Sequence, residues 1–251
     1  MSVPRRTFLK FGLITVLGVL SSIFYRGARK ETRPSAMAPA TRRWGMLIDL
    51  SRCEGCGACI EACHAYHFVP EGQEWIKIYR LKDNPDLPEY FFVRPCMHCE
   101  NPPCVKVCPV KATYRRADGI TLIDINRCIG CRMCMAACPY GARYFTWEDP
   151  PPLPPEVQAR GYSPEWGYPH QKGTVAKCDF CPDLAYLGRL PPYVVACPTG
   201  AIFFGDLNED AISNGRELRR FSETVAKESA YRYREELGTN PRVYYLPARK
   251  K

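Results

Sequence analysis

The fifteen cysteines of this 251-residue chain fall into four short groups, and their spacing constrains the fold more than any other feature. Two groups have the spacing C-x2-C-x2-C-x3-C. They are Cys53, Cys56, Cys59 and Cys63, and then Cys128, Cys131, Cys134 and Cys138. A loop with this spacing directs three thiolates at one cubane iron–sulfur cluster, and the fourth cysteine, one helical turn further on, binds a neighbouring cluster.

The other two groups are variants of the same pattern. In one of them two prolines widen the second gap, and its members are Cys96, Cys99, Cys104 and Cys108. The last group has only three members, Cys178, Cys181 and Cys197. When segment 193–198 is aligned with segment 104–109, Tyr193 stands where the third thiolate should be. The fourth group therefore lacks one ligand.

Two other uses of cysteine explain this pattern less well. Disulfides are usual in exported proteins, but cysteines at i, i+3 and i+6 and an odd total favour metal binding. Zinc sites also use C-x2-C pairs. They do not explain repeated runs that end in Cys-Pro, as they do at Cys108, Cys138 and Cys197. The pattern therefore predicts iron–sulfur clusters.

The cysteine groups belong to an internal repeat. Segment 47–53, Leu-Ile-Asp-Leu-Ser-Arg-Cys, returns at 122–128 as Leu-Ile-Asp-Ile-Asn-Arg-Cys. Segment 93–99 returns in the same way at 175–181, and three groups end in Cys-Pro-x-x-Ala. Such repeats indicate duplication of a small module. We therefore predict an α+β fold with two ferredoxin-like modules, of the bacterial dicluster kind, over residues 44–208.

Two insertions and a tail complete the predicted layout. Residues 70–90 and the proline-rich segment 149–172 are insertions that interrupt the repeat, and the second is expected to be an irregular loop. They are either surface excursions or contacts with partner subunits. Charges alternate with scattered apolar residues from 209 to 236, which predicts a solvated helix, and residues 243–246 are apolar enough to pack on the body. Residues 209–251 are therefore predicted to be a C-terminal helix and packing tail.

The positive charge of the chain is concentrated at its N-terminus. Residues 1–43 contribute +8 of the formal net charge of +9, so the rest offers no basic stripe for nucleic acid. Arg5 and Arg6 precede a short apolar run, 11–25, and resemble a twin-arginine export signal, although Pro4 replaces the usual Ser or Thr. Residues 1–43 are thus expected to be a signal, or an uncleaved membrane anchor. Because this route exports folded proteins, the predicted location is the periplasmic face of the cytoplasmic membrane.

The cysteine pattern over residues 44–246 resembles that of four-cluster ferredoxin-type subunits that serve dimethyl sulfoxide, polysulfide and tetrathionate reductases. The similarity is strongest to the exported iron–sulfur subunit of the sulfite-reduction-associated (Dsr-type) membrane complex. The resemblance implies a non-catalytic electron-transfer subunit, with no catalytic residue, in a hetero-oligomeric complex. The implied partners are a polysulfide-reductase-type integral membrane subunit that reacts with quinone, and a multihaem cytochrome or molybdopterin subunit. The alternatives are a dedicated molybdoenzyme subunit, a free periplasmic ferredoxin and a catalytic iron–sulfur enzyme.

The resemblance also implies how four sites share the cysteines, with the first group paired to the fourth and the second to the third. Carried over by position, site 1 takes Cys53, Cys56, Cys59 and Cys197; site 2 takes Cys96, Cys99, Cys104 and Cys138; site 3 takes Cys128, Cys131, Cys134 and Cys108; and site 4 takes Cys178, Cys181 and Cys63 beside Tyr193. Three thiolates are enough for a 3Fe–4S cluster. The expected cofactors are therefore three 4Fe–4S clusters and one 3Fe–4S cluster, and the alternatives for site 4 are a 4Fe–4S cluster with another ligand or an empty site.

Three histidines lie within or directly after cysteine groups. His98 stands between two predicted ligands and is expected to hydrogen-bond near the cluster rather than to bind iron. His64 and His67 follow Cys63, and either could complete site 4, although packing is the commoner role for such residues.

Overall fold

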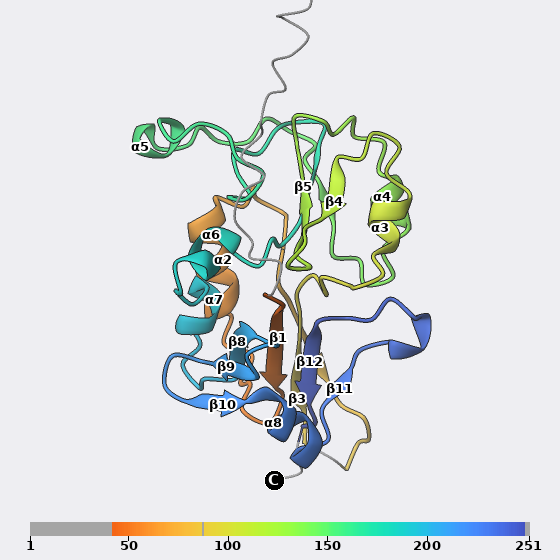
Figure 1. The fold of residues 1–251 in the computed structure, drawn as a ribbon, viewed down its shortest axis with the longest axis vertical. Helices are drawn as coiled ribbons and strands as arrows, with labels where there is room; N and C mark the ends of the chain where they lie inside the picture. Colours follow the sequence, from red (N-terminus) through yellow and green to blue (C-terminus); the bar gives the residue numbers. More distant parts are fainter. Residues whose placement is uncertain (1–41, 87, 249–251) are drawn as a thin grey trace, which may run out of the picture. The chain divides into compact units, whose positions relative to one another are not determined.

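The computed structural model describes residues 42–86 and 88–248, which all belong to one structural unit (Figure 1). The predicted export signal and its apolar run lie outside the described residues. Among the described residues, no helix has the length and apolar character needed to span a membrane.

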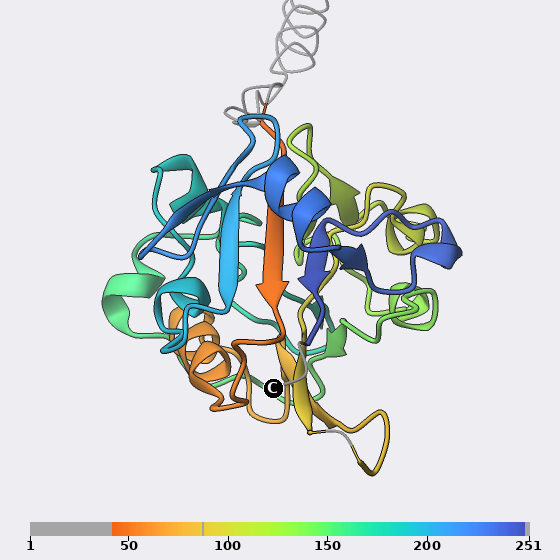
Figure 2. The same cartoon turned by 90° about the horizontal axis from the view of Figure 1, so that it is seen from below.

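A six-stranded sheet forms one half of the core, in the order β10-β9-β8-β1-β12-β11. All six residues of the central strand β1 (Trp44–Asp49) are buried. Figure 2 shows β1 between its two neighbours, the antiparallel β8 and the parallel β12. The other strands are β8 (Ile202–Asp206), β9 (Ala211–Ser213), β10 (Leu218–Arg220), β11 (Tyr231–Arg232) and β12 (Val243–Leu246).

Side chains alternate between the two faces of this sheet, as strand geometry requires. One face joins the main core through Met46, Ile48 and Tyr245. The opposite face holds a smaller cluster that includes Leu47 and Phe203, and α8 (Phe221–Lys227) covers it with partly buried Phe221 and Val225. The apolar tail therefore lies inside the sheet rather than on top of the body, because β12 pairs directly with β1.

The structure does not have the helical tail that the sequence predicted over residues 209–236. This segment contains the β9–β10 hairpin, the seven-residue helix α8, strand β11 and the 3-10 turn η1 (Glu235–Leu237). The hairpin turns at Asn214-Gly215, where Gly215 has a φ of 85° and the Asn214 amide donates to the Gly200 carbonyl at 2.8 Å. The loop between the two strands spans residues 214–217, and strand pairing here outweighs the alternation of charges.

Four helices lie within or beside the four cysteine groups. Helix α2 (Ala58–His67) packs against α7 (Pro192–Val195), and α3 (Pro103–Lys106) packs against α4 (Met133–Ala136). In Figure 1, α3 and α4 lie side by side next to the hairpin of β4 (Thr113–Arg115) and β5 (Thr121–Ile123). The helix of the first cysteine group thus packs against that of the fourth, and the helix of the second group packs against that of the third.

The remaining elements connect these two helix pairs. Strands β2 (Lys77–Leu81) and β3 (Tyr90–Arg94) form a hairpin that occupies much of the first predicted insertion, and β6 (Tyr144–Phe145) pairs with β7 (Val175–Ala176). Helix α6 (Pro182–Tyr186) follows the fourth cysteine group. The second insertion contains only one short helix, α5 (Pro155–Gln158). It is otherwise irregular, as predicted.

The irregular segment 149–172 is held to the body by a buried histidine. His170 is 7% exposed, lies edge-on to Trp75, and donates from Nε2 to the His67 carbonyl at 2.8 Å. Burial is the main reason that the pKa of His170 is lowered from 6.5 to about 4. The folded chain therefore keeps this imidazole neutral well below neutral pH.

His170→Gln should make the protein less sensitive to acid, because glutamine can donate the same hydrogen bond but does not titrate. Between pH 6.5 and 4 the unfolded wild type binds more protons at this position than the folded chain, so its stability falls as the pH falls. At pH 5.5 this costs about 1 kcal/mol of unfolding free energy. Urea titrations at pH 5.5 and 7.5 should show a larger loss for the wild type, and equal losses would contradict the assignment.

Candidate iron–sulfur sites

The cysteines predicted for site 2 line one cavity, together with residues at the start of α3. Cys96 and Cys99 follow β3, Cys104 lies on α3 and Cys138 follows α4, and all four line the cavity. Burial, and then the charge of Cys96, raises the pKa of Cys99 to about 12. The Thr239 hydroxyl hydrogen-bonds to Cys99 and opposes that rise. The C-terminal segment therefore contributes directly to this site.

The cysteines predicted for site 3 line a second cavity, beside the start of α4. The cavity is lined by Cys108, Cys128, Cys131 and Cys134. Cys131 is exposed, whereas Cys134 is buried. Gly130 has a φ of 68°, and a Cβ atom there would lie 2.1 Å from the Gly173 carbonyl oxygen. Only glycine lets the loop approach the second insertion so closely.

The cysteines predicted for site 1 gather at the start of α2. Burial and the charges of Cys53, Cys197 and Cys56, in that order, raise the pKa of Cys59 to about 12. Cys56 is exposed to solvent. The Cys197 sulfur accepts the Ala201 N–H at 3.3 Å. A residue near the end of the fold is thus brought to the first cysteine loop.

Site 4 is the most enclosed of the four, since Cys63, Cys178 and Cys181 are all buried. Tyr193 is 1% exposed, and its hydroxyl has no hydrogen-bond partner among the described residues. Burial, followed by the charges of Cys181, Cys178 and Cys63, raises the pKa of Tyr193 well above its usual value. The phenol therefore stays protonated near the three cysteines.

Charge interactions between cysteines link the four predicted sites in a series. In each of three pairs, burial has the largest effect on the pKa of one cysteine, and the charge of a cysteine from another site raises that pKa further. The pairs are Cys63 with Cys59, Cys178 with Cys96, and Cys134 with Cys104. These charge interactions link site 1 to site 4, site 4 to site 2, and site 2 to site 3.

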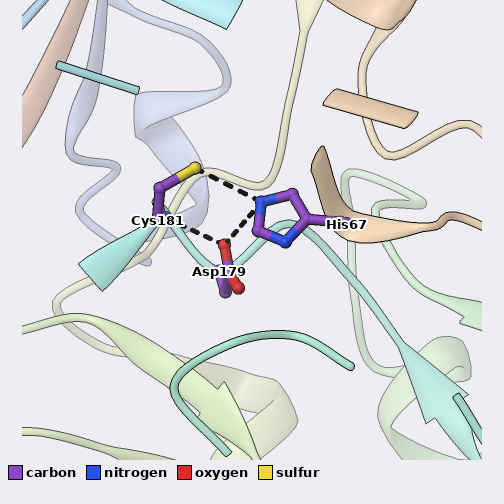
Figure 3. Close-up of side chains that lie close together, drawn as sticks. All are labelled: His67, Asp179 and Cys181. Carbon is purple, nitrogen blue, oxygen red and sulfur yellow. Dashed lines mark hydrogen bonds and ion pairs between the residues drawn. The ribbon is translucent and has the colours of Figure 1, made fainter. Parts of the chain in front are cut away.

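His67 lies next to a sulfur of site 4 (Figure 3). It extends from α2, and its Nε2 is 3.3 Å from the Cys181 sulfur and 3.4 Å from an Asp179 carboxylate oxygen. Its Nδ1 lies 3.1 Å from the Trp166 carbonyl oxygen, which accepts that N–H. His67 thus contacts a sulfur that the sequence already predicts to bind iron. No sequence signal pointed to Asp179, which lies between two cysteines of the loop.

Both ring nitrogens of His98 form hydrogen bonds, and one of these bonds joins it to Cys178 of site 4. Its Nε2 donates to the Cys178 carbonyl at 3.0 Å, and its Nδ1 accepts the Thr121 N–H at 3.2 Å. Its ring stacks on Phe180 with centroids 3.8 Å apart. Burial lowers the pKa of His98 well below its usual value, so the ring is neutral. This agrees with the expectation that His98 hydrogen-bonds and does not bind iron.

The donor set fits iron–sulfur clusters. All fifteen cysteines lie in the described part of the chain, and none forms a disulfide. Burial raises the pKa of several of them, so the protein alone disfavours the thiolates that it collects. Iron bound at these sites would displace those protons and neutralise the gathered negative charge. The disulfide alternative is not supported by this arrangement.

Comparison with known families gives the class of protein. Residues 44–65 match the family described as "4Fe-4S binding domain", and residues 88–150 match "4Fe-4S dicluster domain". These segments contain the first three cysteine groups. The chain is therefore an iron–sulfur protein with dicluster domains and a mixed helix and strand fold.

Full-length similarity defines the family more narrowly. The chain is 40% identical to the iron–sulfur cluster-binding subunit of menaquinone reductase from Nitratidesulfovibrio vulgaris, over 82% of its own length and 89% of that protein. It is 38% identical to a selenate reductase subunit of Mesobacillus selenatarsenatis, over 81% and 72%. It is 39% identical to a protein of Halobacterium salinarum named as a dimethyl sulfoxide reductase iron–sulfur subunit, over 81% and 78%. The chain belongs to the family of iron–sulfur electron-transfer subunits of the polysulfide and dimethyl sulfoxide reductase type, as its sequence predicted.

Proposed function

We propose that this chain relays single electrons through four clusters in the order site 1, site 4, site 2, site 3. The proposal depends on the charge interactions that link cysteines of neighbouring sites. When bound, the clusters supply reversible one-electron chemistry. The chain's residues hold neighbouring clusters close together and keep water away from sites 4 and 2. We assign it no catalytic residue, because the sulfurs that could react are committed to iron.

The two ends of the series are where electrons enter and leave. Cys56 in site 1 and Cys131 in site 3 are exposed, whereas all three cysteines of site 4 are buried. Large apolar side chains lie exposed around site 3, namely Ile129, Met133 and Trp147. Arg132 lies 4.9 Å from the Trp147 ring. An apolar rim around an exposed cluster is suitable for contact with another redox protein.

We infer a hetero-oligomeric complex in which one end of the series meets an integral membrane, quinone-reactive subunit of the polysulfide-reductase type. The other end would meet a multihaem cytochrome or a molybdopterin subunit. The name of the Nitratidesulfovibrio vulgaris relative, a subunit of menaquinone reductase, supports the quinone-linked partner. The Dsr-type complex is our first assignment. A molybdenum-containing reductase is the second candidate, supported by the relatives named as selenate and dimethyl sulfoxide reductase subunits.

We further infer that site 4 holds a 3Fe–4S cluster and that the other three sites hold 4Fe–4S clusters. Site 4 brings three sulfurs together and presents a protonated phenol where a fourth ligand would stand. A 3Fe–4S cluster lacks the iron that would need this ligand. His67 does not replace the missing ligand, because its Nε2 lies 3.3 Å from the Cys181 sulfur, too close for a ligand of a different iron in the same cluster.

The purified chain should contain about fifteen iron atoms and about sixteen inorganic sulfides, as expected for three 4Fe–4S clusters and one 3Fe–4S cluster. The oxidised protein should show the EPR signal of one 3Fe–4S cluster, and reduction should reveal the 4Fe–4S signals. Chemical analysis and EPR of anaerobically purified protein test this. A colourless protein without iron would contradict the relay, and full iron content without the oxidised signal would contradict the assignment of site 4.

Tyr193→Cys should convert site 4 into a four-thiolate site, because residue 193 aligns with Cys104 of the complete second group. The oxidised 3Fe–4S signal should disappear, and about one more iron per chain should bind. Tyr193→Phe is the matched control and should keep the signal, because it adds no ligand. Persistence of the signal in Tyr193→Cys would show that residue 193 does not face the missing corner.

We propose that the chain works at the periplasmic face of the cytoplasmic membrane. Replacing Arg5 and Arg6 together by lysine should therefore keep the protein in the cytoplasm with its clusters inserted, because the twin arginines are the recognised part of the signal. Cell fractionation with an antibody measures this, and N-terminal sequencing of the exported wild type shows whether the signal is removed. Unchanged export of the double-lysine variant would contradict the localisation.

A further inference from the structure

Arg143 is a buried cation at the junction of sites 2 and 3. It is 4% exposed and lies just before β6. Its Nη1 donates to the Thr113 hydroxyl at 3.1 Å, and its buried Nη2 has no hydrogen-bond partner among the described residues. Arg143 lines the site 2 cavity, and Thr113 lines the site 3 cavity. The guanidinium therefore lies between the two cavities.

The groups that face this guanidinium are cysteine sulfurs from both sites. Arg143 is within hydrogen-bonding reach of Cys104, which belongs to site 2, and of Cys134, which belongs to site 3. The charges that act on it most strongly are those of Cys104, Cys134 and Cys96. Its strongest charge partners are thus all predicted cluster ligands, and none of them is a carboxylate.

The internal repeat shows that the fold itself does not require a cation here. Arg143 follows the Cys-Pro-x-x-Ala ending of the third cysteine group, and the equivalent residue of the fourth group is Ile202. Ile202 is 2% exposed and begins strand β8. An apolar side chain therefore serves at the same position in the other half of the molecule. Burying a charge costs several kcal/mol unless it is paired, which indicates that Arg143 is retained for its charge.

We propose that Arg143 sets the reduction potentials of the clusters at sites 2 and 3 by hydrogen-bonding to one sulfur ligand of each. A fixed positive charge stabilises the reduced, more negative form of a cluster, and hydrogen bonds to the sulfurs act in the same direction. Each transfer reduces one cluster and oxidises its neighbour by one electron. No proton moves, because arginine remains charged in proteins. One side chain therefore raises both potentials together and leaves the difference between them, which sets the free energy of the transfer, nearly unchanged.

This inference rests on the proposed relay, and redox titration of the intact, cluster-loaded chain tests it. Arg143→Met approximates the unbranched aliphatic part of the arginine side chain and removes the charged guanidinium. The midpoint potentials of the clusters at sites 2 and 3 should each fall by at least about 59 mV. For a one-electron couple this corresponds to a tenfold loss in affinity for the electron. The potentials of sites 1 and 4 should not change. EPR-monitored titrations measure all four, after Cys99→Ser and Cys131→Ser have assigned the signals of sites 2 and 3.

Two further variants separate the charge from packing. Arg143→Lys keeps the charge and should show a smaller fall than Arg143→Met. Ile202→Met, at the equivalent position in the other half, should leave sites 2 and 3 unchanged. If Arg143→Met loses iron, the comparison moves to Arg143→Lys and Arg143→Gln, in which the charged variant should have the higher potentials.

Two results are decisive and can be told apart. Four intact clusters with unchanged potentials in Arg143→Met would overturn this inference and leave the relay standing. Wild-type protein without clusters at sites 2 and 3 would instead overturn the relay itself.

Discussion

The structure depends on the gathering of cysteine sulfurs that are far apart in the sequence. Site 1 combines the loop before α2 with Cys197, and site 2 combines the loop after β3 with Cys138. Each of these sites places several thiols in a small volume, where burial raises their pKa and so disfavours the thiolates. Iron reverses this penalty, because it binds the thiolate and releases the proton. Folding and cluster binding are therefore coupled, and the helices that carry the cysteines can be as short as four residues.

The two halves of the molecule have related cysteine groups but differ in the residues around their sites. The half built on β1, α2 and α7 has a long helix, an apolar residue at Ile202 and the incomplete site 4 with Tyr193. The half built on α3 and α4 has two cavities that are each lined by four cysteines, and a buried arginine between them. The two halves thus share a framework. They differ at the positions of residues 143 and 193, so the environments of the sites are unequal, and the environment of a cluster affects its reduction potential.

The C-terminal segment binds these halves together. Strand β12 completes the sheet beside β1, Thr239 hydrogen-bonds to Cys99, and the Tyr140 hydroxyl lies 2.5 Å from the Thr239 hydroxyl. The sequence predicted that this tail would pack, but it did not predict that the tail would enter the sheet. The helix predicted over residues 209–236 failed for a related reason, since the Asn214-Gly215 turn and strand pairing decide that segment. Charge alternation describes exposure and does not distinguish a helix from an edge strand.

Sequence alone determined the chemistry of this protein. The spacing of the cysteines, the Cys-Pro endings and the substitution of Tyr193 are local features, so they can be read along the chain without knowledge of the fold. Only the tertiary structure decided which sites are neighbours, that His98 uses both ring nitrogens, and that Arg143 reaches sulfurs of two sites. The physical reason is that charge and hydrogen bonding act through space over a few ångströms, between residues whose separation along the chain does not reveal their contact.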